Sequence, residues 1–368
     1  MKYFVALLLA VTGTFVLAQP STAGTEIRAS VARPSAERVG GEVLVRGRVA
    51  GPASSVKIQK RIAGRWVTAR HATVTHGAYG ARVPATATRT TTLRAVAAAT
   101  VSQVVSVAPT TSTDACGDRP VKADGTLWSC SFVDDFNGTS LDRSKWQVQT
   151  SFASGVQAAH ACYLDDPSVI NESDGTLNLT VRKVAKPVSC SFGGLTGATN
   201  YVAGSVYTHG LFSQQYGRFE ARIKNTAAAV KGLQETFWLW PDDRVPSKAV
   251  WPAAGEIDVA ETYSNYFNLM IPFLHYGYGM PATPTVNTAW NCAAQRGVFN
   301  TYTLIWSATR LEIQVNGKTC LVNTSGNVAF QKPYIVALTQ LLGAAGNEYD
   351  GRAPLPATMN IDYVRVWK

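Results

Sequence analysis

The stretch that decides the fold of this chain is Gly-Glu-Ile-Asp-Val-Ala-Glu-Thr-Tyr, residues 255–263. Its β-branched aliphatic residues favour a strand, although acidic residues are depleted in strands. Because strand side chains alternate between faces, Glu256 and Asp258 point to one face and the aliphatic side chains to the other. Glu261 has the opposite parity, and a one-residue bulge around residues 259–260 brings it to the acidic face. We therefore expect three carboxyls on one face of a strand whose other face packs in a core.

Carboxyls in this arrangement suit the cleavage of glycosidic bonds. That reaction uses one carboxyl as nucleophile or base and a second, with a raised pKa, as proton donor. Like charges held close together raise the pKa of one of them, so an acid between two others is tuned by its neighbours. The alternative is a solvated strand face in a structural sheet. Aromatic rings, which stack on the apolar faces of sugars, surround the acids and favour the first interpretation: they are Trp238, Trp240, Trp251, Tyr263 and Tyr266.

The acidic stretch resembles the signature of glycoside hydrolase family 16, in the bulged six-residue form that is typical of laminarinases and agarases. Four further segments resemble the family's strands and follow the family's order. They are Tyr-Gly-Arg-Phe-Glu-Ala-Arg (216–222), Phe-Trp-Leu-Trp-Pro (237–241), His-Tyr (275–276) and Ile-Asp-Tyr-Val-Arg-Val-Trp (361–367). Together the motifs cover residues 114–368.

The resemblance implies an all-β fold, a concanavalin-like β-jelly-roll sandwich with a substrate cleft across its concave sheet. It implies that Glu256 is the nucleophile, that Glu261 is the general acid/base, and that Asp258 holds the orientation and protonation of the nucleophile. The mechanism is then retaining and needs no cofactor. At Asp362 the family often has a ligand of a structural calcium ion on the convex face.

The aromatic residues and one histidine are candidates for substrate binding. In a strand, Trp238 and Trp240 share one face, and we expect that face to be the cleft and not the core. Trp251 precedes the acids in a Pro-rich loop and is expected to form a wall, with Tyr263 as a further contact. His275 aligns with a family strand that lines the cleft, although a lone histidine is often structural.

Several residues near the expected cleft differ from the family pattern. Glu235 stands where laminarinases usually have a small or apolar residue, and Ala260 is smaller than their usual bulge residue. Residues 242–254 form a distinctive loop, and residues 264–272 replace a short Gly-rich connection. The substrate is therefore less firmly indicated than the reaction.

The periodicity of residues 114–368 independently predicts strands. Polar and apolar residues alternate within 176–181, 217–223, 302–306 and 311–317, and no sustained helical period occurs. Asn-Gly at 316–317 is a strong signal for a two-residue hairpin turn. About 250 residues of such strands fit two large antiparallel sheets. Three tryptophans are expected in the core between them: Trp146, Trp306 and Trp367.

Residues 1–23 read as a secretory signal peptide, with one lysine followed by an apolar run. The run is broken by Thr-Gly-Thr at 12–14 and is short for a membrane anchor. No later segment reaches about eighteen uninterrupted apolar residues. We expect an exported, monomeric protein without a membrane span.

Residues 24–108 predict a second, smaller domain. Alternating strands at 43–49, 56–61 and 91–96 indicate a small β-sandwich, and the segment resembles the immunoglobulin-like modules of secreted actinobacterial enzymes. Residues 109–113 form a Pro/Thr linker to the domain at 114–368.

The charge of the chain is concentrated before the linker. Residues 24–113 carry thirteen Lys and Arg against three Glu, whereas residues 114–368 carry twenty basic and twenty-one acidic residues, so the formal net charge of +10 belongs almost wholly to the smaller domain. This charge suits an anionic cell wall or glycan as partner; a soluble spacer is the alternative. Nucleic acid is not expected, because no recognition motif is present.

Six cysteines in an exported chain predict three disulfides among fifteen possible connectivities. We expect sequential pairing, because each loop is then short: Cys116–Cys130, Cys162–Cys190 and Cys292–Cys320. No Cys/His spacing indicates zinc.

These observations predict a secreted, endo-acting retaining glycoside hydrolase whose substrate is a β-1,3-glucan of the laminarin type. Alternatives within the same fold and mechanism are agarose, a carrageenan or another β-glucan as substrate, or transfer of the glycosyl group to a sugar hydroxyl. A non-catalytic glucan-binding protein is the rival from another class. Such proteins usually lose the catalytic glutamates, and both are present here.

Overall fold

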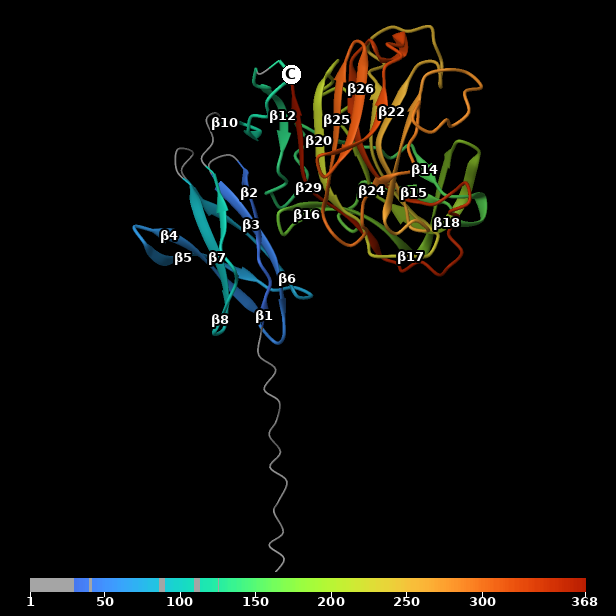
Figure 1. Cartoon of the computed structure of the whole chain (residues 1–368). Helices are drawn as coiled ribbons and strands as arrows, with labels where there is room; N and C mark the ends of the chain where they lie inside the picture. The colour runs from blue at the N-terminus through green and yellow to red at the C-terminus, as the bar shows by residue number, and fades with distance from the viewer. Residues whose placement is uncertain (1–29, 40–41, 86–89, 109–112, 125) are drawn as a thin grey trace, which may run out of the picture. The chain divides into compact units, whose positions relative to one another are not determined.

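The structure, a computed structural model, describes residues 30–39, 42–85, 90–108, 113–124 and 126–368. The expected signal peptide and most of the expected linker lie outside the described residues. The chain divides into two compact units, one ending at residue 109 and the other beginning at residue 110. Figure 1 shows strands throughout both units, and the only described helices are two 3-10 turns, Gln157–Ala159 and Val328–Phe330. The all-β class predicted from the sequence is therefore confirmed, and no described helix is long and apolar enough to cross a bilayer.

The first unit contains two antiparallel sheets that enclose a core of mostly aliphatic side chains. One sheet is formed by β1 (Ser30–Val31), β3 (Glu42–Ala50), β2 (Ser35–Val39) and β6 (Ala78–Pro84). The other is formed by β5 (Arg65–Thr73), β4 (Ser55–Ile62), β7 (Thr91–Ala97), β8 (Thr100–Val101) and β9 (Val105–Val107). The predicted strands at 43–49, 56–61 and 91–96 lie within β3, β4 and β7.

The second unit is a sandwich of one seven-stranded and one eleven-stranded sheet, preceded by the short pair β10 (Thr113–Asp114) and β11 (Gly117–Asp118). The seven-stranded sheet has the order β13 (Gln147–Val148), β19 (Ser205–Tyr207), β28 (Tyr334–Leu342), β21 (Leu233–Pro241), β22 (Glu256–Tyr263), β23 (Leu269–His275) and β24 (Cys292–Ala293). The acidic strand β22 is therefore an internal strand of this sheet.

The eleven-stranded sheet packs against the seven-stranded one. Its main path is β14 (Ala153–Ser154), β15 (Ala161–Tyr163), β18 (Leu195–Ala203), β17 (Thr176–Phe192), β29 (Ala357–Trp367), β20 (Gly217–Lys224), β25 (Asn300–Ser307), β26 (Arg310–Val315) and β27 (Lys318–Asn323). Two strands pair beside this path, β12 (Cys130–Asp134) with β29 and β16 (Ile170–Ser173) with β17. Figure 1 shows β20, β25 and β26 running side by side.

One large hydrophobic core lies between the two sheets of the sandwich. Side chains that alternate with polar ones in the sequence meet there, as strand periodicity requires. Trp146 and Trp306, both predicted for the core, lie in it and are 0% and 1% exposed. Ile257 and Val259 of β22 are fully buried in the same core, and burying an aliphatic side chain of this size contributes about 1.5–3 kcal/mol. The expectation for Trp367 is wrong: it is 2% exposed but has the opposite strand parity to the core residues Val364 and Val366. Its ring lies 5.7 Å from the guanidinium of Arg218 on the other face of the sheet.

Covalent links and a tight turn reinforce the strand pairing. All three predicted disulfides are present, Cys116–Cys130, Cys162–Cys190 and Cys292–Cys320. The last joins β24 of the seven-stranded sheet to β27 of the eleven-stranded sheet. The predicted Asn-Gly turn connects β26 to β27, with φ angles of 50° at Asn316 and 77° at Gly317.

Candidate active site

The register of β22 places its three acids on one face. Trp238 of β21 pairs with Asp258, whereas the preceding residue of β21 pairs with Ala260, so Val259 is an extra residue on β22. The pairing with β23 shifts in the same place. The extra residue changes the parity of the strand, because strand side chains alternate. Glu256, Asp258 and Glu261 consequently share the face that points away from the core.

The start of β22 is fixed by a glycine that no other residue could replace without strain. Gly255 has a φ of 95°, in the left-handed region that side chains with a Cβ rarely adopt. A Cβ at this position would also collide with the hydroxyl of Tyr334. The chain therefore turns into the strand at one defined point, immediately before Glu256.

Glu256 lies among an indole donor, a histidine and a second carboxyl. The indole Nε1 of Trp251 donates a 2.7 Å hydrogen bond to its Oε2. The backbone of Glu256 pairs with that of His275 across the strands. Burial is the largest and the charge of Asp258 the second largest of the causes that raise the pKa of the Glu256 carboxyl well above its usual value. His275 and the Trp251 hydrogen bond oppose that shift.

Asp258 is buried between the other two acids. Its Oδ2 lies 3.2 Å from Nε2 of His275. Burial and the neighbouring charge of Glu261 raise the pKa of Asp258 well above its usual value. Burial and the charges of neighbouring carboxyls thus raise the pKa of both Glu256 and Asp258, so the protonation of one acid depends on that of the next.

Glu261 accepts one hydrogen bond on each oxygen. The Nε2 of Gln234 donates to Oε1 at 2.8 Å, and the hydroxyl of Tyr263 donates to Oε2 at 2.9 Å. Burial raises the pKa of Glu261, and these two hydrogen bonds oppose the shift because they stabilise the charged form. The carboxyl that ends the acidic row is thus held in a fixed orientation.

The candidate substrate-binding residues surround this row. Trp238 and Trp240 are partly exposed, with ring centroids 5.9 Å apart, while the residues that alternate with them are fully buried. The indole of Trp238 is anchored by a 3.0 Å hydrogen bond to Thr339. Trp251 is 52% exposed and lies beside His275, with ring centroids 5.5 Å apart. Tyr263, predicted as a substrate contact, instead donates to Glu261 in this structure.

Sequence reasoning missed Gln234. It has the same strand parity as Trp238 and Trp240, so the alternation that places those two residues could also have placed Gln234 on the acidic face. Its backbone pairs with that of Tyr263, so the two hydrogen-bond donors to Glu261 are direct cross-strand neighbours.

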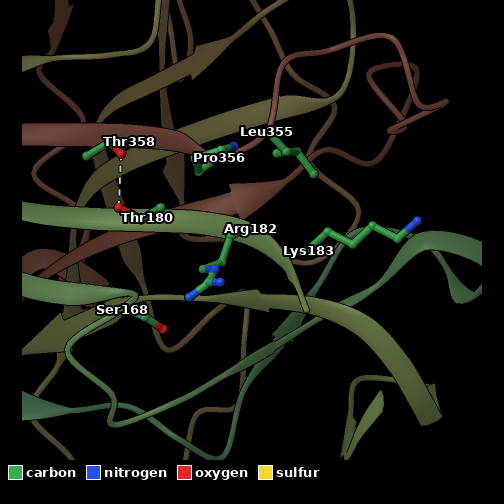
Figure 2. A pocket seen from close by; sticks show the side chains of 7 residues that line it. All are labelled: Ser168, Thr180, Arg182, Lys183, Leu355, Pro356 and Thr358. Carbon is green, nitrogen blue, oxygen red and sulfur yellow. Dashed lines mark hydrogen bonds between the residues drawn. The ribbon is translucent and has the colours of Figure 1, made fainter. Parts of the chain in front are cut away.

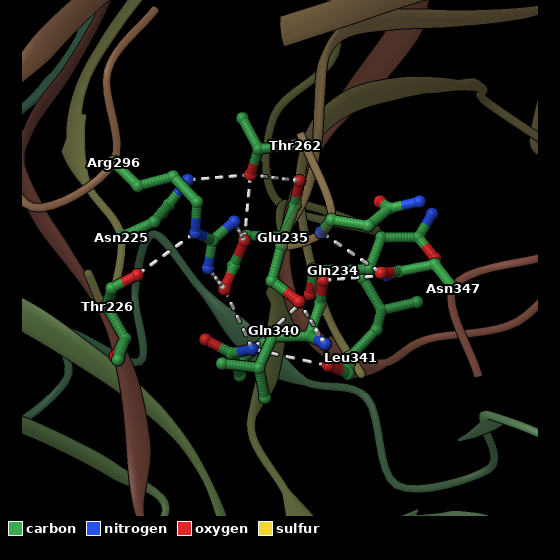
Figure 3. A network of polar contacts seen from close by, with 12 residues as sticks. Asn225, Thr226, Gln234, Glu235, Thr262, Arg296, Gln340, Leu341 and Asn347 are labelled. Atoms are coloured by element: carbon green, nitrogen blue, oxygen red, sulfur yellow. Dashed lines mark hydrogen bonds and ion pairs between the residues drawn. The ribbon is translucent and has the colours of Figure 1, made fainter. Parts of the chain in front are cut away.

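The expectation that Glu235 lies near the cleft is wrong. Its strand parity places it on the inner side of β21, where its carboxylate forms a bidentate ion pair with Arg296, with both N–O distances 2.7 Å. The side chains are 0% and 1% exposed. Figure 3 shows the surrounding network: Thr262 donates to Glu235 Oε2 at 2.8 Å, Asn225 donates to Thr262 at 2.7 Å, and Gln340 donates to Glu235 Oε1 at 3.3 Å.

Asp362 does not fit a calcium ligand in this structure. Its carboxylate lies 2.9 Å from the guanidinium of Arg222, and its side chain is 1% exposed. The compensating positive charge is therefore already supplied by an arginine. Within the described part of the chain, Asp362 also belongs to none of the groups of acids, histidines and cysteines that approach each other closely enough to share an ion.

A hollow of about 440 Å³ lies elsewhere on the second unit. Figure 2 shows it over β17 and β29, with Thr180 and Thr358 joined by a 2.9 Å hydrogen bond. It is lined by Ser168, Thr180, Arg182, Lys183, Leu355, Pro356 and Thr358. Since no carboxyl is among them, this hollow does not offer the acid/base chemistry that β22 does.

Comparison with known proteins gives a family match over most of the second unit. Residues 157–365 match the model of glycosyl hydrolases family 16. Glucan endo-1,3-beta-glucosidase A1 of Niallia circulans is 26% identical over 263 residues, which cover 64% of this chain and 37% of that protein. Keratan-sulfate endo-1,4-beta-galactosidase of Sphingobacterium multivorum is 30% identical over 251 residues, which cover 66% and 54%. The chain thus spans about a third to a half of the length of these relatives.

Solved structures agree with the fold. The catalytic domain of an endo-1,3-beta-glucanase (laminarinase) from Thermotoga petrophila superposes with a TM-score of 0.53 at 21% identity, covering 66% of this chain and 98% of that one. A non-specific endo-beta-1,3(4)-glucanase of family 16 superposes with a TM-score of 0.55 at 26% identity, covering 68% and 96%. With a family model matched over more than half of its length, the chain belongs to glycosyl hydrolase family 16.

Proposed function

We propose that this protein is an endo-acting retaining glycoside hydrolase in which Glu256 is the nucleophile and Glu261 the general acid/base. The observation that carries the proposal is the shared face of Glu256, Asp258 and Glu261 on β22, where each acid has a distinct set of partners. Retaining glycosidases need two carboxyls with different roles, and different surroundings separate the roles.

In the first step, a carboxylate oxygen of Glu256 attacks the anomeric carbon of the sugar. The Trp251 indole holds Oε2, so Oε1 is the attacking oxygen. The bond between that carbon and the glycosidic oxygen breaks, and Glu261 gives its proton to the departing oxygen. The sugar is now linked to Glu256 as an ester, and Glu261 is a carboxylate.

In the second step, Glu261 takes a proton from water while the water oxygen attacks the same carbon. The ester bond breaks, Glu256 leaves as a carboxylate, and Glu261 regains its proton. Asp258 acts as a positioning residue, because its charge raises the pKa of the Glu256 carboxyl. Every step is a nucleophilic attack or a proton transfer that these side chains supply, so no cofactor takes part.

The substrate we propose is a β-1,3-glucan of the laminarin type. The support is the similarity to a glucan endo-1,3-beta-glucosidase and to the fold of laminarinase catalytic domains, together with the exposed indole of Trp251 and the partly exposed indoles of Trp238 and Trp240 beside the acids. Indole faces stack on the apolar faces of pyranose rings. We further propose that the enzyme is exported, because three disulfides suit an oxidising compartment.

One relative supports a second candidate substrate. The keratan-sulfate endo-1,4-beta-galactosidase shares 30% identity over 66% of this chain, a higher identity than the glucanase relative has. A polysaccharide with internal β-galactosidic bonds is therefore the alternative, processed through the same covalent intermediate.

The test is release of reducing ends from a panel of polysaccharides by the wild-type chain and by Glu256→Gln. The panel contains laminarin, curdlan, lichenan, xyloglucan, agarose, carrageenan and keratan sulfate. Cleavage of laminarin that is lost in Glu256→Gln supports both substrate and nucleophile. Cleavage of keratan sulfate or agarose alone keeps the mechanism and overturns the substrate, and undiminished activity of Glu256→Gln overturns the catalytic assignment.

A further inference from the structure

The first unit carries an unusual run of positive charge. Residues 43–113 contain ten Lys and Arg and not one Asp or Glu. Soluble domains normally intersperse charges of both signs, because like charges on a compact domain repel each other. A run of this kind therefore has a cost to stability that a neutral spacer has no reason to bear.

The positive charge is distributed unequally between the two sheets. The acids that precede this run, Glu37 and Glu42, lie on β2 and β3 of the first sheet. The strands of the second sheet, β5, β4, β7, β8 and β9, contain no acidic residue. All charged residues in the strands of the second sheet are thus basic.

Strand alternation directs one set of these cations to a single face. Val56 and Ile58 of β4 are fully buried in the core of the unit, so the residues between and beyond them face outward. Arg61 pairs with Trp66 of β5, and Gln59 pairs with Arg94 of β7. Paired residues in an antiparallel sheet point to the same side, so these side chains share the outward face.

The same face continues along β4. Lys57 pairs with His71 of β5 and is exposed, as is Arg61. Residues two apart on a strand are about 7 Å apart. A row of polar and cationic groups therefore lies along the strand, formed by Lys57, Gln59 and Arg61. We call it the β4 row.

An aromatic ring and an amide hold one arginine of this face in place. The guanidinium of Arg94 lies 4.3 Å from the ring centroid of Trp66, and its Nε donates a 2.8 Å hydrogen bond to Oε1 of Gln59. The guanidinium of Arg61 lies 6.0 Å from the same ring. In the described part of the chain, no ion pair neutralises Arg61 or Arg94. A guanidinium held in this way loses less conformational entropy on binding.

We propose that the β4 row, together with Trp66 and Arg94, binds an anionic polysaccharide through its carboxylate or sulfate groups. Guanidinium groups bind such oxyanions with paired, charge-assisted hydrogen bonds. This ligand differs from the neutral glucan proposed for β22, so the surface anchors the enzyme to a second, charged polymer. Nucleic acid fits less well, because stacking of bases needs an open aromatic face, and the ring of Trp66 lies under Arg94.

The experiment compares two double variants that each remove two positive charges. Arg61→Gln/Arg94→Gln alters the proposed surface, and Arg33→Gln/Arg48→Gln alters exposed arginines that lie outside the second sheet. Binding of the full chain to polygalacturonate, dextran sulfate, neutral dextran and double-stranded DNA is measured by calorimetry at about 50 mM and about 300 mM NaCl, since salt screens such contacts. Circular dichroism verifies that each variant is folded, and laminarin hydrolysis serves as the control for the second unit.

We expect wild type to bind one or both anionic polysaccharides and to bind them less tightly at high salt. We expect no binding to neutral dextran. Arg61→Gln/Arg94→Gln weakens that binding at least about tenfold, the loss expected for a hydrogen bond to a charged group. Arg33→Gln/Arg48→Gln changes it by less than about twofold. Polygalacturonate and dextran sulfate separate carboxylate from sulfate recognition. Equal loss in both double variants, tighter binding to DNA than to either polymer, or no binding by wild type overturns the proposal.

Discussion

The side-chain amide of Gln234 donates a hydrogen bond to Oε1 of Glu261, while Tyr263 holds Oε2. An amide nitrogen can only donate, whereas a phenol hydroxyl can donate or accept. When Glu261 is protonated, its proton therefore belongs on Oε2, where the Tyr263 hydroxyl can rotate and accept it. In the mechanism that we propose, two cross-strand neighbours thus select the oxygen that delivers the proton to the glycosidic bond.

Replacing Gln234 with Leu should change the pH dependence of the reaction. The amide stabilises the charged form of Glu261, so its removal raises the pKa of that carboxyl. Because Glu261 must be protonated in the first step, the alkaline limb of the kcat/KM profile moves to higher pH. Laminarin hydrolysis measured across the pH range gives the limb. Tyr263→Phe should shift it less than Gln234→Leu does, because the Tyr263 hydroxyl can also accept from the protonated form. A uniform loss of rate with an unmoved limb would argue that Gln234 is merely structural.

Asp258→Asn should move the opposite limb. The charge of Asp258 raises the pKa of Glu256, and an amide carries no charge, so the pKa of Glu256 falls in the variant. Glu256 must be ionised to attack, and the acid limb of kcat/KM therefore moves to lower pH. We also expect the rate at the optimum to fall roughly 10²-fold, because the carboxylate that lies beside the nucleophile and 3.2 Å from His275 is lost. An acid limb that stays in place or moves upward contradicts this role for Asp258.

Glu261→Gln should separate the two chemical steps. With an aryl β-laminaribioside whose leaving group needs no protonation, the first step still proceeds. The second step lacks its base and slows by about 10²–10⁴-fold. The glycosyl-enzyme then accumulates and appears in intact-mass spectra as an added disaccharide, which peptide mapping should locate on Glu256. If no adduct forms while wild type cleaves the same substrate, Glu261 and Glu256 do not have these roles.

Features set by strand parity and by short-range spacing could be predicted from the sequence. The alternation of Trp238 and Trp240 with buried neighbours follows from a period of two, and the Asn-Gly turn at 316–317 follows from its need for positive φ. The sequential disulfides follow from loops of 14 and 28 residues that close within one unit. All of these depend on interactions between residues that are close in sequence or share one strand pair.

Partners distant in the sequence could not be predicted. Glu235 stands out in the sequence as unusual, but its partner Arg296 is 61 residues away. The sequence around Arg296 gives no indication that its side chain is buried. The sequence position of Asp362 suggests a calcium ligand, but the structure places it in an ion pair with Arg222, which is 140 residues away. Which of several possible cations neutralises a buried carboxylate depends on the packing of two sheets, and no local pattern encodes that.

The buried pair of Glu235 and Arg296 leads to a stability prediction. Arg296→Met leaves the Glu235 carboxylate without its charge partner in the core, which should cost about 3–5 kcal/mol of unfolding free energy. The double variant Glu235→Gln/Arg296→Met removes the charge and keeps a group that can accept from Thr262, so most of the loss should be recovered. Urea unfolding at neutral pH measures both, provided that the m-value is unchanged.

A surface pair provides the matched control for this comparison. Arg310 lies 3.0 Å from Glu312 but is 48% exposed, so Arg310→Met should cost less than about 1 kcal/mol. Thr262, which donates to Glu235, directly follows Glu261, so the charge pair also supports the strand that carries the proposed acid/base. We therefore expect Arg296→Met to lower kcat for laminarin while the double variant regains it. Equal stability of wild type and Arg296→Met contradicts the assignment of a buried, charge-dependent support.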